Sequence, residues 1–485
     1  MPKAKCVVTN NESPYTVHSY YPLKAKMKQE GTKKPDTFEA VFPMQNDVDQ
    51  NYEISYIQDV VDTTWLSAVY PMQLSCLDES GYEQDPTDPA ESRFTKVTSG
   101  KFKGHYALQF TADSQGVEVP SAKTNRIDLS GQFDINIFFT PDTTQLQDGS
   151  DEPILWSFRS STVGLDIGIT GTNGNNSSWK VFLRVDNGSI TSGYTGATSG
   201  LIMTGAPVHI RVKRGSDNLL KAFVNGVEDI SQSVTQNLQP SSTAMVFGDT
   251  ETSTSDEYKG LIHEIKVYCG NTLSDMDATR VWTTKPIAQY MKFNGKVRKL
   301  ESNQTSKKAV CQSNSYQITT YKLGDINSST PDVHALSSTS FKTIVQSALD
   351  EASSGTFTVR NLDTFSHTQE VYALGGTIYE IGSVVEFINI LLTYSECVMY
   401  FTPRKNVIIE SDAGHATDNI FDQNNPTQGC NIRSSESNDI KLVTQVVIVG
   451  RTSSVDRSIT PHDGITRTLR RNVRQLGGGT TDHDI

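Results

Sequence analysis

The first chemistry to look for in this sequence is a pair of carboxylates that could cleave a glycosidic bond. A retaining glycosidase holds two such groups about 5–5.5 Å apart, which alternate residues of one strand can provide because they share a face. No strand-like Glu-x-Asp-x-Glu segment occurs, and Asp148, Asp151 and Glu152 surround a glycine in an expected loop. Glu228 and Asp229 are adjacent, so in a strand they would point to opposite faces. The acids therefore do not predict a glycosidase.

Other catalytic and cofactor motifs are also missing. The sequence contains no Gly-x-Ser-x-Gly nucleophile elbow, no His-Glu-x-x-His motif, no P-loop and no dinucleotide fingerprint. The six cysteines are scattered, without the paired spacing of a zinc site. His209 and His263 lie in alternating, strand-like segments, where a histidine is usually structural. We therefore predict that the protein is not an enzyme and that it has no cofactor, with calcium as the one candidate ion.

A binding site is easier to assemble from this sequence than a catalytic one. Carbohydrate sites combine an aromatic side chain with amides and acids in loops, and such residues gather between positions 173 and 194. The candidate ligand-binding residues are Asn173, Asn175, Asn176, Trp179, Asp186, Asn187 and Tyr194. The alternative is that the asparagines only form turns and that Trp179 belongs to the core. Because Ca²⁺ prefers several oxygen ligands, Asp166, Asp186 and Asp249 are candidate metal ligands, although no EF-type loop is present.

Composition narrows the class of protein. The chain has 485 residues, 36% of them hydrophobic, and a formal net charge of −12 at pH 7. This apolar content supports folded cores, whereas the acidic balance argues against a broad nucleic-acid-binding surface. No run of about 18 apolar residues indicates a membrane span, and the first residues are too polar for a signal peptide. We expect several domains, made in a reducing compartment.

Residues 96–285 have the pattern of an antiparallel β-sandwich. Short alternating segments are separated by Gly, Asn, Asp and Ser, and Asn225-Gly226 is a strong hairpin signal. The runs Lys221-Ala-Phe-Val-Asn-Gly-Val-Glu228 and Gly260-Leu-Ile-His-Glu-Ile-Lys-Val-Tyr268 resemble the laminin-G-like modules of the concanavalin-A-like family. The resemblance implies a jelly roll with a lectin-like role, although this fold also hosts other functions.

The segments on either side of the sandwich have the pattern of a second, split domain. Strand-like runs such as Thr37–Phe42 and Asn51–Ile57 precede it, and Gln289–Leu300 alternates again after it. Helical periodicity follows at residues 340–351 and 383–394. We therefore predict a mainly β fold: split barrel-like domains with a few helices, and an inserted jelly-roll β-sandwich.

The order of the outer elements resembles that of baseplate hub proteins of tailed viruses. It is carried by a barrel strand at Phe293–Leu300, a helix at Phe341–Leu349, a helix–hairpin unit at Phe387–Ile409 and a final strand at Val446–Gly450. The resemblance implies a structural virion protein at the tail tip, made in the host cytoplasm. It also implies a homotrimer that contacts other tail proteins, with the sandwich touching a host-surface glycan or a neighbouring subunit. The alternatives are a hub of a cellular contractile injection apparatus and a secreted protein that binds or hydrolyses glycans.

The chain accordingly divides into five predicted segments. These are 1–95, the first part of a hub barrel; 96–285, the inserted sandwich; 286–330, the remainder of the barrel; 331–455, a second hub domain; and 456–485, a tail that is flexible or ordered by a partner.

Overall fold

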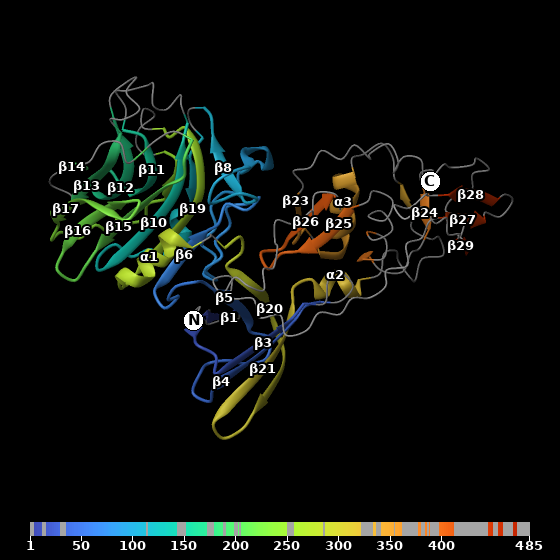
Figure 1. The fold of residues 1–485 in the computed structure, drawn as a ribbon. Coiled ribbons are helices and arrows are strands. Elements are labelled where there is room, and N and C mark those ends of the chain that lie inside the picture. Colours follow the sequence, from blue (N-terminus) through green and yellow to red (C-terminus); the bar gives the residue numbers. More distant parts are fainter. Residues whose placement is uncertain are drawn as a thin grey trace, which may run out of the picture. The chain divides into compact units, whose positions relative to one another are not determined.

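The computed structural model shows a mainly β protein with few helices (Figure 1). It describes residues 4–321 apart from 12–15, 30–34, 113–114, 143–151, 172–178, 188–190, 198–201, 203–204, 250–256 and 285–286, and beyond them 333–335, 341–353, 355–360, 377–379, 384–385, 388, 397–411, 445–449, 454–458 and 469–472. The chain forms two compact units, Met1–Tyr316 with Phe401–Asn406, and Gln317–Tyr400 with Val407–Ile485. Among the described residues, no helix combines the length and hydropathy needed to cross a membrane.

The β-sandwich lies in the first unit and has two sheets. The eight-stranded sheet has the order β17-β16-β15-β10-β19-β8-β7, with β6 also paired to β19, and the six-stranded sheet has the order β14-β13-β12-β11-β18-β9. The strands of the first sheet are β6 (Leu66–Tyr70), β7 (Phe94–Lys96), β8 (Tyr106–Phe110), β10 (Phe133–Pro141), β15 (Val208–Arg214), β16 (Leu219–Val224), β17 (Val227–Ser233) and β19 (Gly260–Cys269). Those of the second are β9 (Val117–Val119), β11 (Ile154–Arg159), β12 (Val163–Thr170), β13 (Lys180–Asn187), β14 (Thr191–Thr195) and β18 (Met245–Phe247).

The two faces of the eight-stranded sheet differ in chemistry. In β15, Val208, Ile210 and Val212 are buried in the apolar core between the sheets, as period-2 alternation requires. The alternate residues, His209 and Arg211, lie on the outer face but are also almost fully buried. This outer face is therefore a covered polar layer, and something other than the second sheet must shield it.

Part of that cover is helix α1 (Asp275–Thr283) (Figure 1). The hydroxyl of Ser274 accepts a hydrogen bond from the backbone N–H of Asp277, which is the usual N-cap arrangement. Ala278 and Val281 are the buried residues of the helix. The helix follows directly after β19, and together with β15 and β16 it encloses the pocket described below.

A seven-stranded antiparallel sheet takes its strands from both flanks of the sandwich. Its order is β2-β1-β5-β20-β21-β4-β3, with β1 (Ala4–Asn10), β2 (Thr16–Tyr20), β3 (Lys24–Lys28), β4 (Thr37–Pro43), β5 (Glu53–Gln58), β20 (Met291–Ser302) and β21 (Ser306–Ser313). The sheet curls strongly. Strands β2 and β4 lie near opposite ends of the strand order, yet the ring centroids of Tyr20 in β2 and Phe42 in β4 are only 6.3 Å apart. Within the described residues, β2 and β3 do not pair with each other. The split barrel-like hub domains that the sequence predicts are not shown.

Some strand pairings join residues from different predicted segments, and the predicted boundaries stay a prediction. Strand β6 precedes residue 95, yet it pairs with β19 in the sandwich sheet. The first unit also continues to Tyr316 without separating the sandwich from the seven-stranded sheet. The first unit also contains two short 3-10 turns, Glu91–Arg93 and Ser121–Lys123. Helix α2 (Tyr316–Thr320) begins at Tyr316, where this part of the unit ends.

The second unit contains α3 (Phe341–Ser353), which confirms the helix predicted at 340–351. Its strands are β22 (Val333–Ala335) paired with β24 (Thr377–Tyr379); β25 (Cys397–Phe401), β26 (Asn406–Ser411) and β23 (Thr358–Arg360) in one sheet; and β27 (Gln445–Val449), β28 (Ser454–Ser458) and β29 (Leu469–Asn472) in another. Most of the second predicted helix, 383–394, lies outside the described residues. Strands β28 and β29 fall within or beside the predicted tail and pair with β27.

Candidate functional site

The predicted carbohydrate-binding residues do not gather around an open aromatic platform. Trp179 has no exposed surface, and a ring that stacks on a sugar must be open to solvent, so its placement is that of a core residue. Asp186 is buried in β13, whereas Tyr194 is partly exposed in β14. Asn173, Asn175 and Asn176 lie outside the described residues, as does the side chain of Asn187. A ligand site in these loops stays a prediction.

The predicted calcium ligands do not form one site. Asp166 is fully buried and already accepts hydrogen bonds from the Ser157 hydroxyl at 2.7 Å, from Arg159 Nε at 2.7 Å and from Arg184 Nη1 at 3.3 Å. Asp186 faces Arg159 at 3.7 Å. In the part of the chain that the structure describes, no group of three His, Cys, Asp or Glu side chains could hold a metal ion. Arginines thus neutralise Asp166 and Asp186 in this structure, and a calcium site at Asp166, Asp186 and Asp249 stays a prediction.

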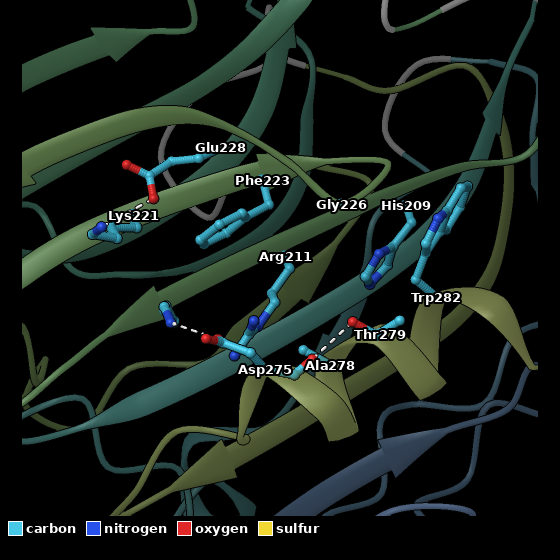
Figure 2. A pocket seen from close by; sticks show the side chains of 11 residues that line it. His209, Arg211, Lys221, Phe223, Gly226, Glu228, Asp275, Ala278, Thr279 and Trp282 are labelled. Atoms are coloured by element: carbon cyan, nitrogen blue, oxygen red, sulfur yellow. Dashed lines mark hydrogen bonds and ion pairs between the residues drawn. The ribbon is translucent and has the colours of Figure 1, made fainter.

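A pocket of about 310 Å³ lies instead between the outer face of the eight-stranded sheet and helix α1 (Figure 2). Strands β15 and β16 and the hairpin that joins β16 to β17 form one side. Asp275, Ala278, Thr279 and Trp282 form the other side, which belongs to the helix. The sequence predicts neither this helix nor this pocket.

Arg211 forms the floor of the pocket and is held by a buried ion pair. Its Nε and Nη2 atoms donate to the carboxylate of Asp134, with Nη2 at 2.6 Å from Oδ2 and Nε at 3.0 Å from both oxygens. Nη2 also donates to the carbonyl oxygen of Leu273, just before α1. Asp134 has no exposed surface, and Arg211 is 5% exposed. This pair fixes the guanidinium at the base of the pocket and ties the helix entry to the sheet.

His209 forms the inner end of the pocket as part of an aromatic stack. Its ring lies 4.4 Å from that of Phe138 and 5.7 Å from that of Trp282, nearly parallel to both. Its Nε2 lies 3.0 Å from the amide oxygen of Asn136, which accepts the bond. Burial, reinforced by nearby Lys101, Arg211 and Lys266, lowers the pKa of His209 well below its usual range. The imidazole is therefore neutral and contributes no charge to the pocket.

The rim of the pocket carries two ion pairs and a second aromatic ring. Lys221 and Glu228, 2.9 Å apart, form a pair across the β16–β17 hairpin (Figure 2). Lys213 lies 3.7 Å from Asp275 of the helix. Phe223 also lines the pocket, and Lys213 Nζ lies 5.5 Å from the centroid of its ring. The rim thus offers hydrogen-bond donors and acceptors close to aromatic surface.

The hairpin turn that borders the pocket needs the residues found there. Asn225 and Gly226 have φ of 51° and 83°, the left-handed values of a two-residue turn that favours Asn-Gly. The Asn225 side chain also accepts a hydrogen bond from the backbone N–H of His209 at 2.9 Å. A Cβ on Gly226 would approach Trp282 to 3.6 Å, so the turn packs directly beside the indole. The turn therefore lies against Trp282 of the helix.

One sequence signal could have indicated this site. His209, Arg211 and Lys213 alternate with Val208, Ile210 and Val212, which marks a polar face on a central strand. This signal does not indicate the second wall of the pocket, because that wall is the helix, about 60 positions later in the sequence. The sequence of β15 alone therefore predicts that its polar face is exposed to solvent.

No protein-family model and no curated protein matches the sequence. Solved structures match part of it. Domain 4 of AbnA, a GH43 extracellular arabinanase from Geobacillus stearothermophilus in complex with arabinotriose, is 19% identical, with 45% of this chain and 98% of that chain covered and a TM-score of 0.33. The Ruminococcus gnavus IT-sialidase CBM40 bound to α2,3 sialyllactose is 16% identical, with 37% and 96% covered and a TM-score of 0.27.

The receptor binding domain of botulinum neurotoxin D is a third match. It is 12% identical, with 45% of this chain and 52% of that chain covered and a TM-score of 0.35. The match thus spans about half of the toxin domain. These identities and TM-scores do not transfer a function to this chain.

Proposed function

We propose that the sandwich domain is a lectin-like module that binds a carbohydrate in the pocket between β15, β16 and α1. One observation carries the proposal. A single cavity of about 310 Å³ combines two aromatic side chains, Trp282 and Phe223, with two lysine–carboxylate pairs at its rim. Binding sites for small molecules are concave, have a volume of roughly 300–1,000 Å³ and combine apolar surface with a few convergent polar groups.

The rim chemistry suits sugar hydroxyl groups. A hydroxyl both donates and accepts hydrogen bonds, whereas an ammonium only donates and a carboxylate only accepts. Lys221 and Glu228, 2.9 Å apart, can therefore satisfy both capacities of one hydroxyl or of two neighbouring hydroxyls. Trp282 and Phe223 provide flat surface against which the C–H face of a sugar ring can pack.

We propose binding rather than hydrolysis for this site. Its two rim carboxylates, Glu228 and Asp275, are each held against a lysine, and the side chain of Asp275 is 94% exposed. A general acid needs a shielded environment that keeps its proton at neutral pH. The rim of the pocket does not supply that environment.

A glycan array probed with the full chain tests the proposal. The double variant Lys221→Met/Glu228→Gln removes the rim pair without touching a buried residue, and a loss of at least about tenfold in binding is expected, equivalent to one 1.4 kcal/mol step. Lys299→Met/Glu301→Gln is the matched control, because it removes an ion pair of the same type, at 2.6 Å, from the seven-stranded sheet. The proposal fails if no glycan binds, or if both double variants bind like the unaltered chain.

For the whole chain, the role of a homotrimeric tail-tip hub in a virion stays a prediction from the resemblance of its outer segments. The seven-stranded sheet places β5 next to β20, on either side of the sandwich in sequence. An inserted module in this position could present its pocket to a host-surface glycan while the sheet belongs to a larger assembly. Other tail proteins as partners belong to the same prediction.

A further inference from the structure

The charges that line the same pocket have a pattern that bears on which carbohydrate it accepts, and the inference drawn from it rests on the proposed function. Every cationic side chain that lines the pocket faces a carboxylate. The pairs are Arg211–Asp134 at 2.6 Å, Lys213–Asp275 at 3.7 Å and Lys221–Glu228 at 2.9 Å. Since His209 is neutral, the three pairs balance three positive charges with three negative ones, of which Glu228 and Asp275 line the pocket and Asp134 is buried against Arg211. The lining as described therefore offers an anionic ligand no cation that lacks a carboxylate partner.

We propose that the pocket selects neutral sugars and discriminates against sugars that carry a carboxylate. The positions of the charges give the reason, because in each rim pair the acid is the more exposed member. The side chain of Glu228 is 43% exposed against 26% for Lys221, and that of Asp275 is 94% exposed against 20% for Lys213. A ligand that enters from solvent therefore meets negative charge first.

The specificity of a binding site depends on repulsive contacts as well as on attractive ones. Like charges that are brought together cost free energy, and this cost excludes wrong partners. A carboxylate on the ligand would have to displace Glu228 from Lys221, or Asp275 from Lys213, to gain a favourable contact. A neutral hydroxyl needs no such exchange, because it can join an existing pair. The rim thus favours the uncharged member of any two sugars that differ only by a carboxylate.

The floor of the pocket is consistent with the same selection. Nε and Nη2 of Arg211 are occupied by Asp134 and the Leu273 carbonyl. Its remaining nitrogen, Nη1, has no hydrogen-bond partner among the described residues, so it is the donor available to a ligand. Because the charge of Arg211 is balanced by Asp134 at 2.6 Å, Nη1 is suited to a hydroxyl or ring oxygen rather than to a second carboxylate.

Calorimetric titration of the full chain with matched sugars tests this selection. The probes are methyl glucoside with methyl glucuronoside, and methyl galactoside with methyl galacturonoside, at low salt so that surface charges are not screened. The neutral member of a pair is expected to bind at least about tenfold more tightly, one 1.4 kcal/mol step. Equal or tighter binding of the uronoside would overturn the inference while leaving carbohydrate binding intact. Failure of every sugar to bind would instead remove the proposed function, and the inference with it.

The variant Glu228→Gln/Asp275→Asn gives a second, opposite readout. It keeps both rim lysines but removes their carboxylates, so the preference is expected to move toward the uronoside by at least about tenfold. Both substituted side chains are exposed, and folding is expected to be unaffected. Glu301→Gln, which frees Lys299 in the seven-stranded sheet, is the matched control and is expected to change nothing. An unchanged ratio in the double variant would contradict the role of the rim acids.

Discussion

The buried pair at the floor of the pocket gives the sharpest prediction about stability. Asp134 has no exposed surface and accepts hydrogen bonds from Arg211, from the backbone N–H of Leu273 at 3.0 Å and from the Asn136 amide at 3.0 Å. Arg211→Met keeps most of the side-chain volume but removes the only cation in ion-pair contact with this carboxylate among the described residues. We expect the variant to fold less stably than the unaltered chain.

The magnitude follows from the burial of both partners. Removing one partner of a buried ion pair costs about 3–5 kcal/mol, because the remaining charge stays buried without compensation. Lys213 pairs at 3.7 Å with a side chain that is 94% exposed, and such a surface pair contributes about 0–1 kcal/mol. At roughly 2–4 °C per kcal/mol for domains of 150–250 residues, Arg211→Met should lower Tm by on the order of 10 °C and Lys213→Met by about 4 °C at most.

Thermal unfolding followed by scanning calorimetry measures both variants side by side. Lys213→Met is the matched control, since it removes a cation from the same strand and the same face. Adding Asp134→Asn to Arg211→Met removes the uncompensated charge, so the double variant should recover part of the lost stability. A loss below about 1 kcal/mol for Arg211→Met, equal to that of Lys213→Met, would refute the account of a shielded pair.

Two further predictions concern pH and assembly. Burial raises the pKa of Glu79 to about 7, against hydrogen bonds from the backbone N–H groups of Tyr290 and Met291. The folded chain then holds this proton at pH values where the unfolded chain has lost it, so stability falls as pH rises from about 4.5 to about 7. Urea denaturation of Glu79→Gln should show a flatter profile across that window, and an identical profile would contradict the assignment. Light scattering after size-exclusion chromatography should give three times the chain mass of 53.4 kDa if the chain is a trimeric hub, whereas a strict monomer at high concentration would count against that role.

The strands of the sandwich were predictable because their inner faces alternate. In β19, Ile265 and Val267 have no exposed surface, as the period-2 pattern predicts. The burial of Glu264 and Lys266 on the other face could not be predicted in this way, because alternating polar residues usually face solvent. Lys266 instead lies 3.2 Å from Asp59, which is 207 positions earlier in the chain. Such a contact depends on tertiary packing and leaves no local signal.

The candidate site was harder to predict than the fold. Its helical wall, α1, is nine residues long and buries only Ala278 and Val281, so its apolar periodicity is weak. The sequence predicts a binding site in the asparagine-rich loops, because amides and aromatic residues are neighbours there in sequence. In the structure, however, Trp179 is enclosed in the core. The pocket is formed only where the helix lies against the polar face of β15. Residues that are close in sequence thus indicated the turns, whereas the pocket is made by residues that are close only in the folded structure.

The most direct test of carbohydrate binding in this pocket is ¹⁹F NMR of the chain labelled with 5-fluorotryptophan. The four tryptophans report on different places: Trp282 lines the pocket, Trp156 and Trp179 have no exposed surface, and Trp65 is 45% exposed elsewhere. Trp282→Phe assigns the pocket signal by its disappearance. Titration with a neutral sugar that binds the chain is predicted to shift the Trp282 signal and leave the other three in place. A shift of Trp179 or Trp65 with Trp282 unchanged would contradict the pocket assignment.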